Sequence, residues 1–155
     1  AQRALHETRA LIFALRPAAL GNQGLAPALR QLRDEASGRL DLQIDLQVTG
    51  ERRIPLDHEQ ALFRITQEAL ANVAKHSGAH AAVVQLEYAE GQTCIKVRDQ
   101  GRGFDPAAPR KPHALGLISI GERASAVGGT CQVTSMPNEG TTVQVCVPNK
   151  PGFDP

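Results

Sequence analysis

The stretch Asp99-Gln100-Gly101-Arg102-Gly103-Phe104 places a carboxylate in front of two glycines that are one residue apart. A carboxylate accepts hydrogen bonds and suits a ligand edge that donates them, such as an exocyclic amine, and the glycines let the backbone come close to a ligand. The same spacing also occurs in ordinary turns, where Asp bonds its own backbone. The rest of the chain decides between a ligand-reading corner and a simple turn.

The composition predicts one globular domain without a nucleic-acid partner. At 155 residues the chain can bury a sizeable core. Its net charge of +1 gives no electrostatic case for nucleic acid or a membrane surface, and one Tyr, four Phe and no Trp offer no base-stacking platform. No apolar run reaches the roughly 20 residues that span a bilayer.

The three cysteines Cys94, Cys131 and Cys146 are widely spaced and fall in predicted strands. We expect them to be buried, reduced thiols of a cytosolic protein. A metal site would need closely paired ligands, and the sequence has no C-x-x-C or H-E-x-x-H pattern.

Hydrophobic periodicity predicts both helices and strands. Apolar residues recur at helical spacing in the segments 1–16, 25–40, 58–76 and 117–127. Alternating or short apolar runs predict strands at 42–48, 81–88, 93–98, 130–135 and 141–147. Asp57 with Gln60 resembles a capping box that opens the third helix. The elements lack strict βαβ alternation, so we expect an α/β two-layer sandwich with a mixed sheet.

The third helix carries polar residues that point one way. Glu68 and Asn72 are four residues apart and project from one face, and Lys75 and His76 lie one turn further on. A solvated polar face explains this pattern simply. The functional alternative is a phosphate and Mg²⁺ edge, where Asn72 supplies a neutral oxygen and Lys75 neutralises a phosphate.

Leu115-Gly116-Leu117 opens the fourth predicted helix. A glycine at a helix start exposes N–H groups to an anion, which the helix macrodipole also favours, although an ordinary loop-to-helix junction has the same sequence. The preceding segment 104–113 contains three prolines and is a candidate lid over a ligand.

These segments, in order, resemble the boxes of the GHKL ATPases, which comprise gyrase B, the heat-shock chaperone ATPase, histidine kinases and the mismatch-repair ATPase. Ile65–Ala79 resembles the N box and Asp99–Phe104 the first glycine box. Leu115–Leu117 with Glu122-Arg123-Ala124 resembles the second glycine box, and Gly140-Thr141 the last. The Asn-x-x-Lys-His-Ser form, the short lid and the Glu-Arg-Ala triplet are similar to bacterial sensor histidine kinases that feed NarL-type response regulators.

The resemblance implies a two-layer sandwich of the GHKL (Bergerat) type, with a mixed, mostly antiparallel sheet packed on helices. It implies ATP as ligand, with Asp99 taking the adenine amine, Thr141 supporting it, and Asn72 coordinating Mg²⁺. It assigns catalytic roles to Glu68, Asn72 and Lys75. The nucleotide-binding residues that it implies are Asn72, Lys75, His76, Asp99, Gly101, Gly103, Leu115, Gly116, Leu117 and Thr141.

The resemblance also implies a division of the chain and its partners. Residues 1–17 would be the end of a second dimerisation helix and 18–148 the ATP-binding catalytic domain, while the Pro- and Gly-rich composition after Pro148 predicts a flexible tail over 149–155. The γ-phosphoryl group would pass to a histidine on the dimerisation helices of the same kinase, outside this sequence, since His6 does not match that position. The parent would be a homodimer whose catalytic domain lies in the cytoplasm and serves a NarL-type regulator.

Two departures from the family pattern keep other functions open. Ala114 stands where the second box usually has glycine, which costs on the order of 1 kcal/mol if the position needs a glycine-only conformation. Gly121 lies inside a predicted helix. One alternative is another GHKL enzyme, such as an anti-sigma serine kinase, against which Lys75-His76 and Leu15-Arg16-Pro17 argue. The other is a non-catalytic nucleotide-binding module.

Overall fold

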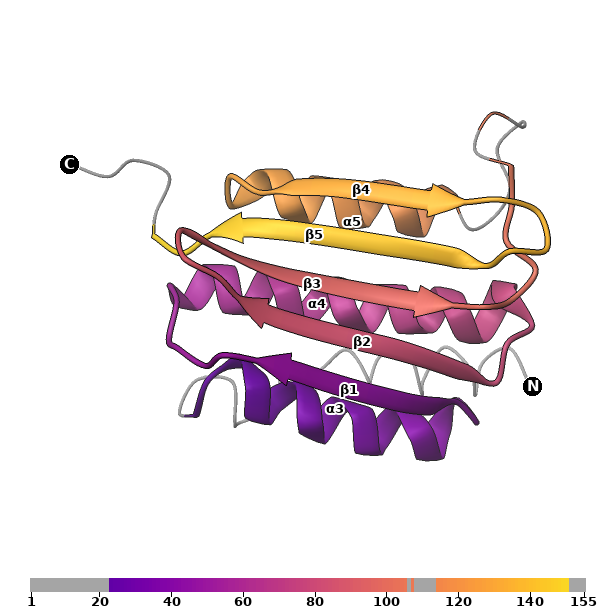
Figure 1. Cartoon of the computed structure of the whole chain (residues 1–155), viewed down its shortest axis with the longest axis horizontal. Helices are drawn as coiled ribbons and strands as arrows, with labels where there is room; N and C mark the ends of the chain where they lie inside the picture. The colour runs from indigo at the N-terminus through magenta and orange to yellow at the C-terminus, as the bar shows by residue number, and fades with distance from the viewer. Residues whose placement is uncertain (1–22, 106, 108–113, 151–155) are drawn as a thin grey trace, which may run out of the picture.

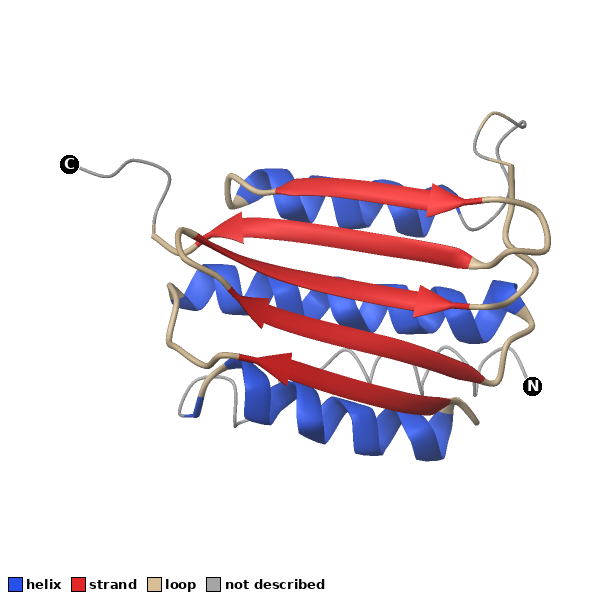
Figure 2. Ribbon diagram, viewed as in Figure 1, coloured by secondary structure: helices blue, strands red, loops and turns tan. Residues whose placement is uncertain are grey.

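A computed structural model of the chain describes residues 23–105, 107 and 114–150, which form two layers (Figure 1). A five-stranded sheet has the order β1-β2-β3-β5-β4. Its strands are β1 (Gln43–Thr49), β2 (Ala81–Tyr88), β3 (Gln92–Asp99), β4 (Thr130–Ser135) and β5 (Thr141–Pro148). The helices are α3 (Leu25–Arg39), α4 (Leu56–Asn72), the π-helix η1 (Val73–Ser77) and α5 (Ala114–Ala126). Helices α3, α4 and α5 all cover the same face of the sheet (Figure 2).

The predicted fold class is confirmed. Strands β1 and β2 pair in parallel, and the other neighbours pair antiparallel, so the sheet is mixed and mostly antiparallel. The strands and the helix expected at 25–40 lie within one residue of their predicted bounds. The helix expected over residues 1–16 and most of the candidate lid lie outside the described residues. No helix that the structure describes is both long and apolar enough to cross a membrane.

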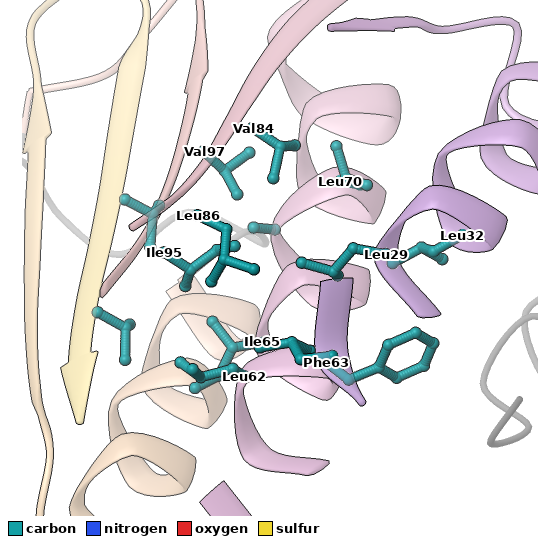
Figure 3. Close-up of a cluster of buried hydrophobic side chains, with 14 of the residues drawn as sticks. Leu29, Leu32, Leu62, Phe63, Ile65, Leu70, Val84, Leu86, Ile95 and Val97 are labelled. Atoms are coloured by element: carbon teal, nitrogen blue, oxygen red, sulfur yellow. The ribbon is translucent and has the colours of Figure 1, made fainter. Parts of the chain in front are cut away.

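The core lies between the sheet and the helices, and it determines where Asp99 points. Leu62, Ile65 and Leu70 of α4 pack among the buried strand residues (Figure 3). Side chains alternate between the two faces of a strand, and along β3 Thr93, Ile95, Val97 and Asp99 are the buried ones. The Asp99 carboxylate therefore lies on the helix-facing side of the sheet, at the end of the core.

The start of α4 differs from the prediction. The helix begins at Leu56 with Pro55 as its N-cap, and no side chain caps it. The Pro55 carbonyl accepts the N–H groups of His58 and Glu59 at 3.0 Å each, and Asp57 Oδ1 accepts the His58 N–H at 3.0 Å. The predicted capping box is therefore wrong. Asp57 lies inside the first turn, where the positive end of the helix macrodipole stabilises its negative charge.

Helix α4 continues into η1, a π-turn that helical spacing did not predict. The turn ends at Gly78, whose φ of 75° is left-handed, and Ser77 Oγ accepts the Ala79 N–H at 2.9 Å. The predicted stop at these residues is confirmed. Lys75 and His76 therefore lie on a widened turn, a distortion often found at functional sites.

Helix α5 begins at Ala114, three residues before the predicted start at 117. Ala114 thus belongs to a right-handed helix, whose backbone conformation any L residue adopts. The strain expected for alanine at this position does not arise. Leu115, Gly116 and Leu117 lie in the first turn of α5, so the prediction that they open this helix is confirmed.

Two cysteines are joined, so the expectation of three reduced thiols is wrong. Cys94 of β3 and Cys146 of β5 are directly opposed in the antiparallel register and form a disulfide with 4.1 Å between their Cα atoms. Their neighbours in β3 and β5 face the core, which places the disulfide on the sheet face away from the helices. Cys131 is free and half-buried, and burial raises the pKa of its thiol.

Candidate nucleotide-binding site

A cavity of about 520 Å³ opens between α4, η1, the start of α5 and the adjacent ends of β3 and β5. This volume lies within the roughly 300–1,000 Å³ that small-molecule and cofactor sites occupy. The structure brings together segments that are far apart in the sequence, as predicted. The predicted site residues that line the cavity are Asn72, Lys75, His76, Asp99, Gly103, Leu117 and Thr141.

Asp99 is the buried carboxylate of the cavity, with 5% of its surface exposed. It is the last residue of β3, and Thr141 stands opposite it at the start of β5. Burial raises the pKa of Asp99, while backbone hydrogen bonds from Gly101 and Thr141 oppose that rise. The Gly101 N–H donates to Asp99 Oδ1 at 2.8 Å, so the turn interpretation also holds. A carboxylate has about four lone-pair sites, which leaves capacity for a ligand donor.

Asn72 ends α4 inside the cavity, and its Nδ2 atom is buried without a hydrogen-bond partner among the described residues. A Cβ added to Gly116 would lie 2.7 Å from Asn72 Oδ1 and 2.8 Å from Nδ2. The glycine therefore lets the first turn of α5 press against the amide. An unsatisfied buried amide is costly, and a ligand in the cavity would relieve that cost.

The donor set fits a magnesium ion that a nucleotide brings with it. Rotation of the Asn72 amide exchanges its oxygen and nitrogen, so the unpartnered position can present a neutral oxygen ligand. Within the described residues no three His, Cys, Asp or Glu side chains cluster to hold a metal ion. Mg²⁺ is commonly held by one or two protein oxygens with phosphate and water completing its shell. Asn72 is the residue that would contribute such an oxygen here.

Two cationic side chains border the cavity. Lys75 of η1 is exposed, as is Arg102 of the glycine segment, and both line the cavity. The Arg102 guanidinium lies over Gly78, where an added Cβ would be 3.2 Å from Nη2. Neither forms a salt bridge within the part of the chain that the structure describes. The exposed charges that line the cavity are these two cations and the Asp105 carboxylate, and their positive balance favours an anionic ligand. Arg102 was not predicted as a site residue, although its place between two glycines was a signal.

The first glycine box has a packing role that the sequence did not reveal. A Cβ on Gly101 would overlap the Ser77 carbonyl and lie 2.6 Å from Ser77 Cβ. The Arg102 N–H donates to that carbonyl at 2.7 Å, so the loop is tied to η1. Gly103 has a φ of 58°, and a Cβ there would overlap the Met136 carbonyl. Gly101 does not line the cavity, and its contact with a nucleotide remains a prediction.

Three other predicted residues are not among those that line the cavity. Gly116 is one of them, although its backbone lies against the Asn72 amide, which does line the cavity. Glu68 is half-buried on α4, one turn before Asn72, and is not among the lining residues. The Leu115 side chain lies outside what the structure describes. The apolar part of the lining, which the sequence marked only as core, is Ala69, Val73, Val97 and Val143. Helical and strand periodicity predicted that these residues are buried, but not that they border a cavity.

Comparison with known proteins places these features in a family. Residues 57–151 match the family described as histidine kinase-, DNA gyrase B-, and HSP90-like ATPase. The chain is 41% identical over 150 residues to sensor histidine kinase LiaS of Bacillus subtilis, covering 96% of the chain and 41% of LiaS. It is 33% identical over 145 residues to the histidine-protein kinase/phosphatase DegS of Brevibacillus brevis, covering 93% of the chain and 37% of DegS. The chain thus spans well under half of each relative.

The fold comparison agrees. The Erythrobacter litoralis blue-light activated histidine kinase superposes with a TM-score of 0.67 at 20% identity, covering 93% of this chain and 48% of that one. At that identity the likeness concerns the fold. The family match covers more than half of the chain and includes Asn72, Asp99 and Thr141. The chain therefore belongs to the histidine kinase-, DNA gyrase B-, and HSP90-like ATPase family.

Proposed function

We propose that this chain is the ATP-binding catalytic domain of a sensor histidine kinase. The observation that carries the proposal is a cavity of about 520 Å³ that is lined both by the buried Asp99 carboxylate and by the exposed cations Lys75 and Arg102. A nucleotide carries a matching group for each, an amine on its base and the negative charge of its phosphates. The relatives LiaS and DegS are named as histidine kinases, which supports the histidine kinase assignment.

In the proposed reaction the bond between the β- and γ-phosphates breaks, a histidine nitrogen gains the phosphoryl group, and ADP leaves. Asp99 would fix the adenine, Lys75 would neutralise phosphate charge, and the N–H group of Gly116 in the first turn of α5 would face the phosphates, with Leu117 lining the cavity beside them. Asn72 would hold Mg²⁺, which when bound neutralises the charge of the transferring group. Such catalysis rests on positioning and electrostatics. Glu68 would act on the attacking nucleophile, and His76 would lie toward the phosphates.

The proposal extends to the acceptor histidine, the partners and the division of the chain. The acceptor histidine would lie on the dimerisation helices of the same kinase, in a homodimer that serves a NarL-type regulator in the cytoplasm. Residues 1–17 would form the end of a dimerisation helix, 18–148 the catalytic domain and 149–155 a tail.

Phosphotransfer to a separate acceptor tests this function. The chain is mixed with γ-labelled ATP and a dimerisation-helix protein from a sensor histidine kinase, with its acceptor-histidine variant as the control. We expect acid-labile label on the helix protein only when the histidine is present. Acid-stable label on serine would favour the serine kinase alternative. ATP binding without any transfer would favour the non-catalytic module.

Asn72→Ala, which removes the amide, should lower the affinity for Mg-ATP about tenfold. The affinity for ADP without magnesium should stay within about twofold of the wild-type value. Gly116→Ala should reproduce this pattern, because its Cβ would displace the Asn72 side chain. Titration calorimetry with and without Mg²⁺ measures both. Gly121→Ala on the same helix is the matched control, since its Cβ would meet nothing within 4 Å. Equal losses with and without Mg²⁺ would contradict the metal role of Asn72.

A further inference from the structure

The structure points to a residue outside the predicted site that sets base specificity. We propose that Ser135 fixes the hydrogen-bond polarity of Thr141, so that the corner around Asp99 presents only acceptors to the base. Ser135 acts as a positioning residue, since it does not line the cavity. The proposal rests on the proposed function, because it concerns how the same site reads the base of ATP.

Ser135 is a buried hydroxyl with three hydrogen-bond contacts. It is the last residue of β4 and is 5% exposed. Its Oγ lies 3.0 Å from the Gly140 carbonyl oxygen and 2.9 Å from Thr141 Oγ1. The Phe104 N–H donates to the same Oγ at 2.9 Å. One side chain thus joins β4, the start of β5 and the last residue of the first glycine box.

The direction of these bonds follows from counting protons. A hydroxyl has one proton to donate and two lone pairs that accept. The Gly140 carbonyl can only accept, so it takes the Ser135 proton, and the Phe104 N–H can only donate, so it takes one lone pair. The second lone pair remains for Thr141. All three contacts are satisfied together only when the Thr141 hydroxyl donates to Ser135.

This direction determines what Thr141 offers the cavity. Its single proton is used on Ser135, so the Thr141 oxygen can only accept from a molecule in the cavity that it lines. Asp99 stands opposite Thr141 in the strand register and, as a carboxylate, also only accepts. Two acceptors favour a base with an exocyclic amine and disfavour one with a carbonyl at the same position. A Thr141 hydroxyl that is free to rotate would also donate to a carbonyl, so it would discriminate less between the two bases.

The test compares ATP with inosine triphosphate, in which a carbonyl replaces the amine. The wild-type domain should bind ATP more tightly than inosine triphosphate. Ser135→Ala should reduce the ratio of the inosine triphosphate dissociation constant to the ATP dissociation constant about tenfold. Ser135→Thr keeps the hydroxyl and should retain the ratio within about twofold. Thr134→Ala is the matched control, because Thr134 is the exposed neighbour on the opposite face of β4. It should leave the ratio unchanged.

The outcomes separate this proposal from its rivals. An unchanged ratio in Ser135→Ala, including equal weakening of both nucleotides, would assign Ser135 a structural role only and overturn the proposal. If Ser135→Ala does not fold, as judged by thermal melting, Thr141→Val takes its place, because it removes the acceptor that Ser135 is proposed to orient. Thr141→Val must reduce the ratio of the inosine triphosphate dissociation constant to that of ATP, and an unchanged ratio overturns the proposal. Wild-type protein that binds neither nucleotide would reject the proposed function itself, and this inference with it.

Discussion

Replacing Asp99 by asparagine should weaken ATP binding about 100-fold, as measured by titration calorimetry. The Gly101 N–H, which donates to Asp99 Oδ1 at 2.8 Å, would keep the oxygen of the new amide in that position. The NH₂ group would then face the base and oppose its amine. A donor against a donor loses the bond and leaves a buried group unsatisfied.

Asp105→Asn is the matched control for this variant. Asp105 lines the same cavity but is exposed, so removal of its charge should change ATP affinity by less than about threefold. Equal losses in the two variants would mean that Asp99 acts only through long-range charge. Unchanged affinity in Asp99→Asn would remove the carboxylate from the site.

The pH dependence gives an independent readout of the same residue. Burial raises the pKa of Asp99 above the ordinary aspartate value, and only the ionised form is purely an acceptor. ATP affinity should therefore be complete above this pKa and fall as the pH is lowered through it. ATP itself also titrates, so the profile of Asp99→Asn is subtracted. A difference that does not depend on pH would contradict this assignment.

The second large effect is expected from Gly101→Ala, which should destabilise the domain by about 2–3 kcal/mol. The added Cβ would overlap the Ser77 carbonyl and crowd Ser77 Cβ, and backbone atoms cannot move aside cheaply. The φ of Gly101 is not positive, so packing rather than backbone strain is tested. A fall in melting temperature of about 5–10 °C is expected for a domain of this size.

Gly121→Ala again provides the contrast, because the same methyl group is added inside α5 with nothing within 4 Å of it. It should stabilise the domain by up to about 1 kcal/mol, since glycine is a poor helix former. Equal stability changes in the two variants would rule out the close approach of the glycine segment to η1.

The sequence predicted the type and order of the described elements because burial alternates with the right periods. The alternation along β3 even indicates that Asp99 shares a face with Ile95 and Val97. The predicted N box and glycine boxes meet at one cavity. These features depend on local pattern, which a sequence displays directly.

The features that the sequence did not predict depend mostly on contacts between segments that are distant in the chain. The start of α4 came from Pro55, whose carbonyl competes with a side-chain cap. The π-turn has no signal in helical spacing. The place of Gly101 reflects packing of the glycine segment on η1. The polar contacts of Ser135 require β4 and β5 to be neighbours, and the partner of Cys94 requires the register of β3 with β5. No local pattern contains that register.

The disulfide has a topological consequence. It joins positions 52 residues apart, so the backbone from Cys94 to Cys146 closes into a covalent ring. That ring contains the glycine segment, residues 104–113 and α5. One peptide bond hydrolysed within residues 104–113 would open the ring but leave a single covalent molecule, whose mass rises only by that of one water. The two pieces would part only on treatment with a reductant.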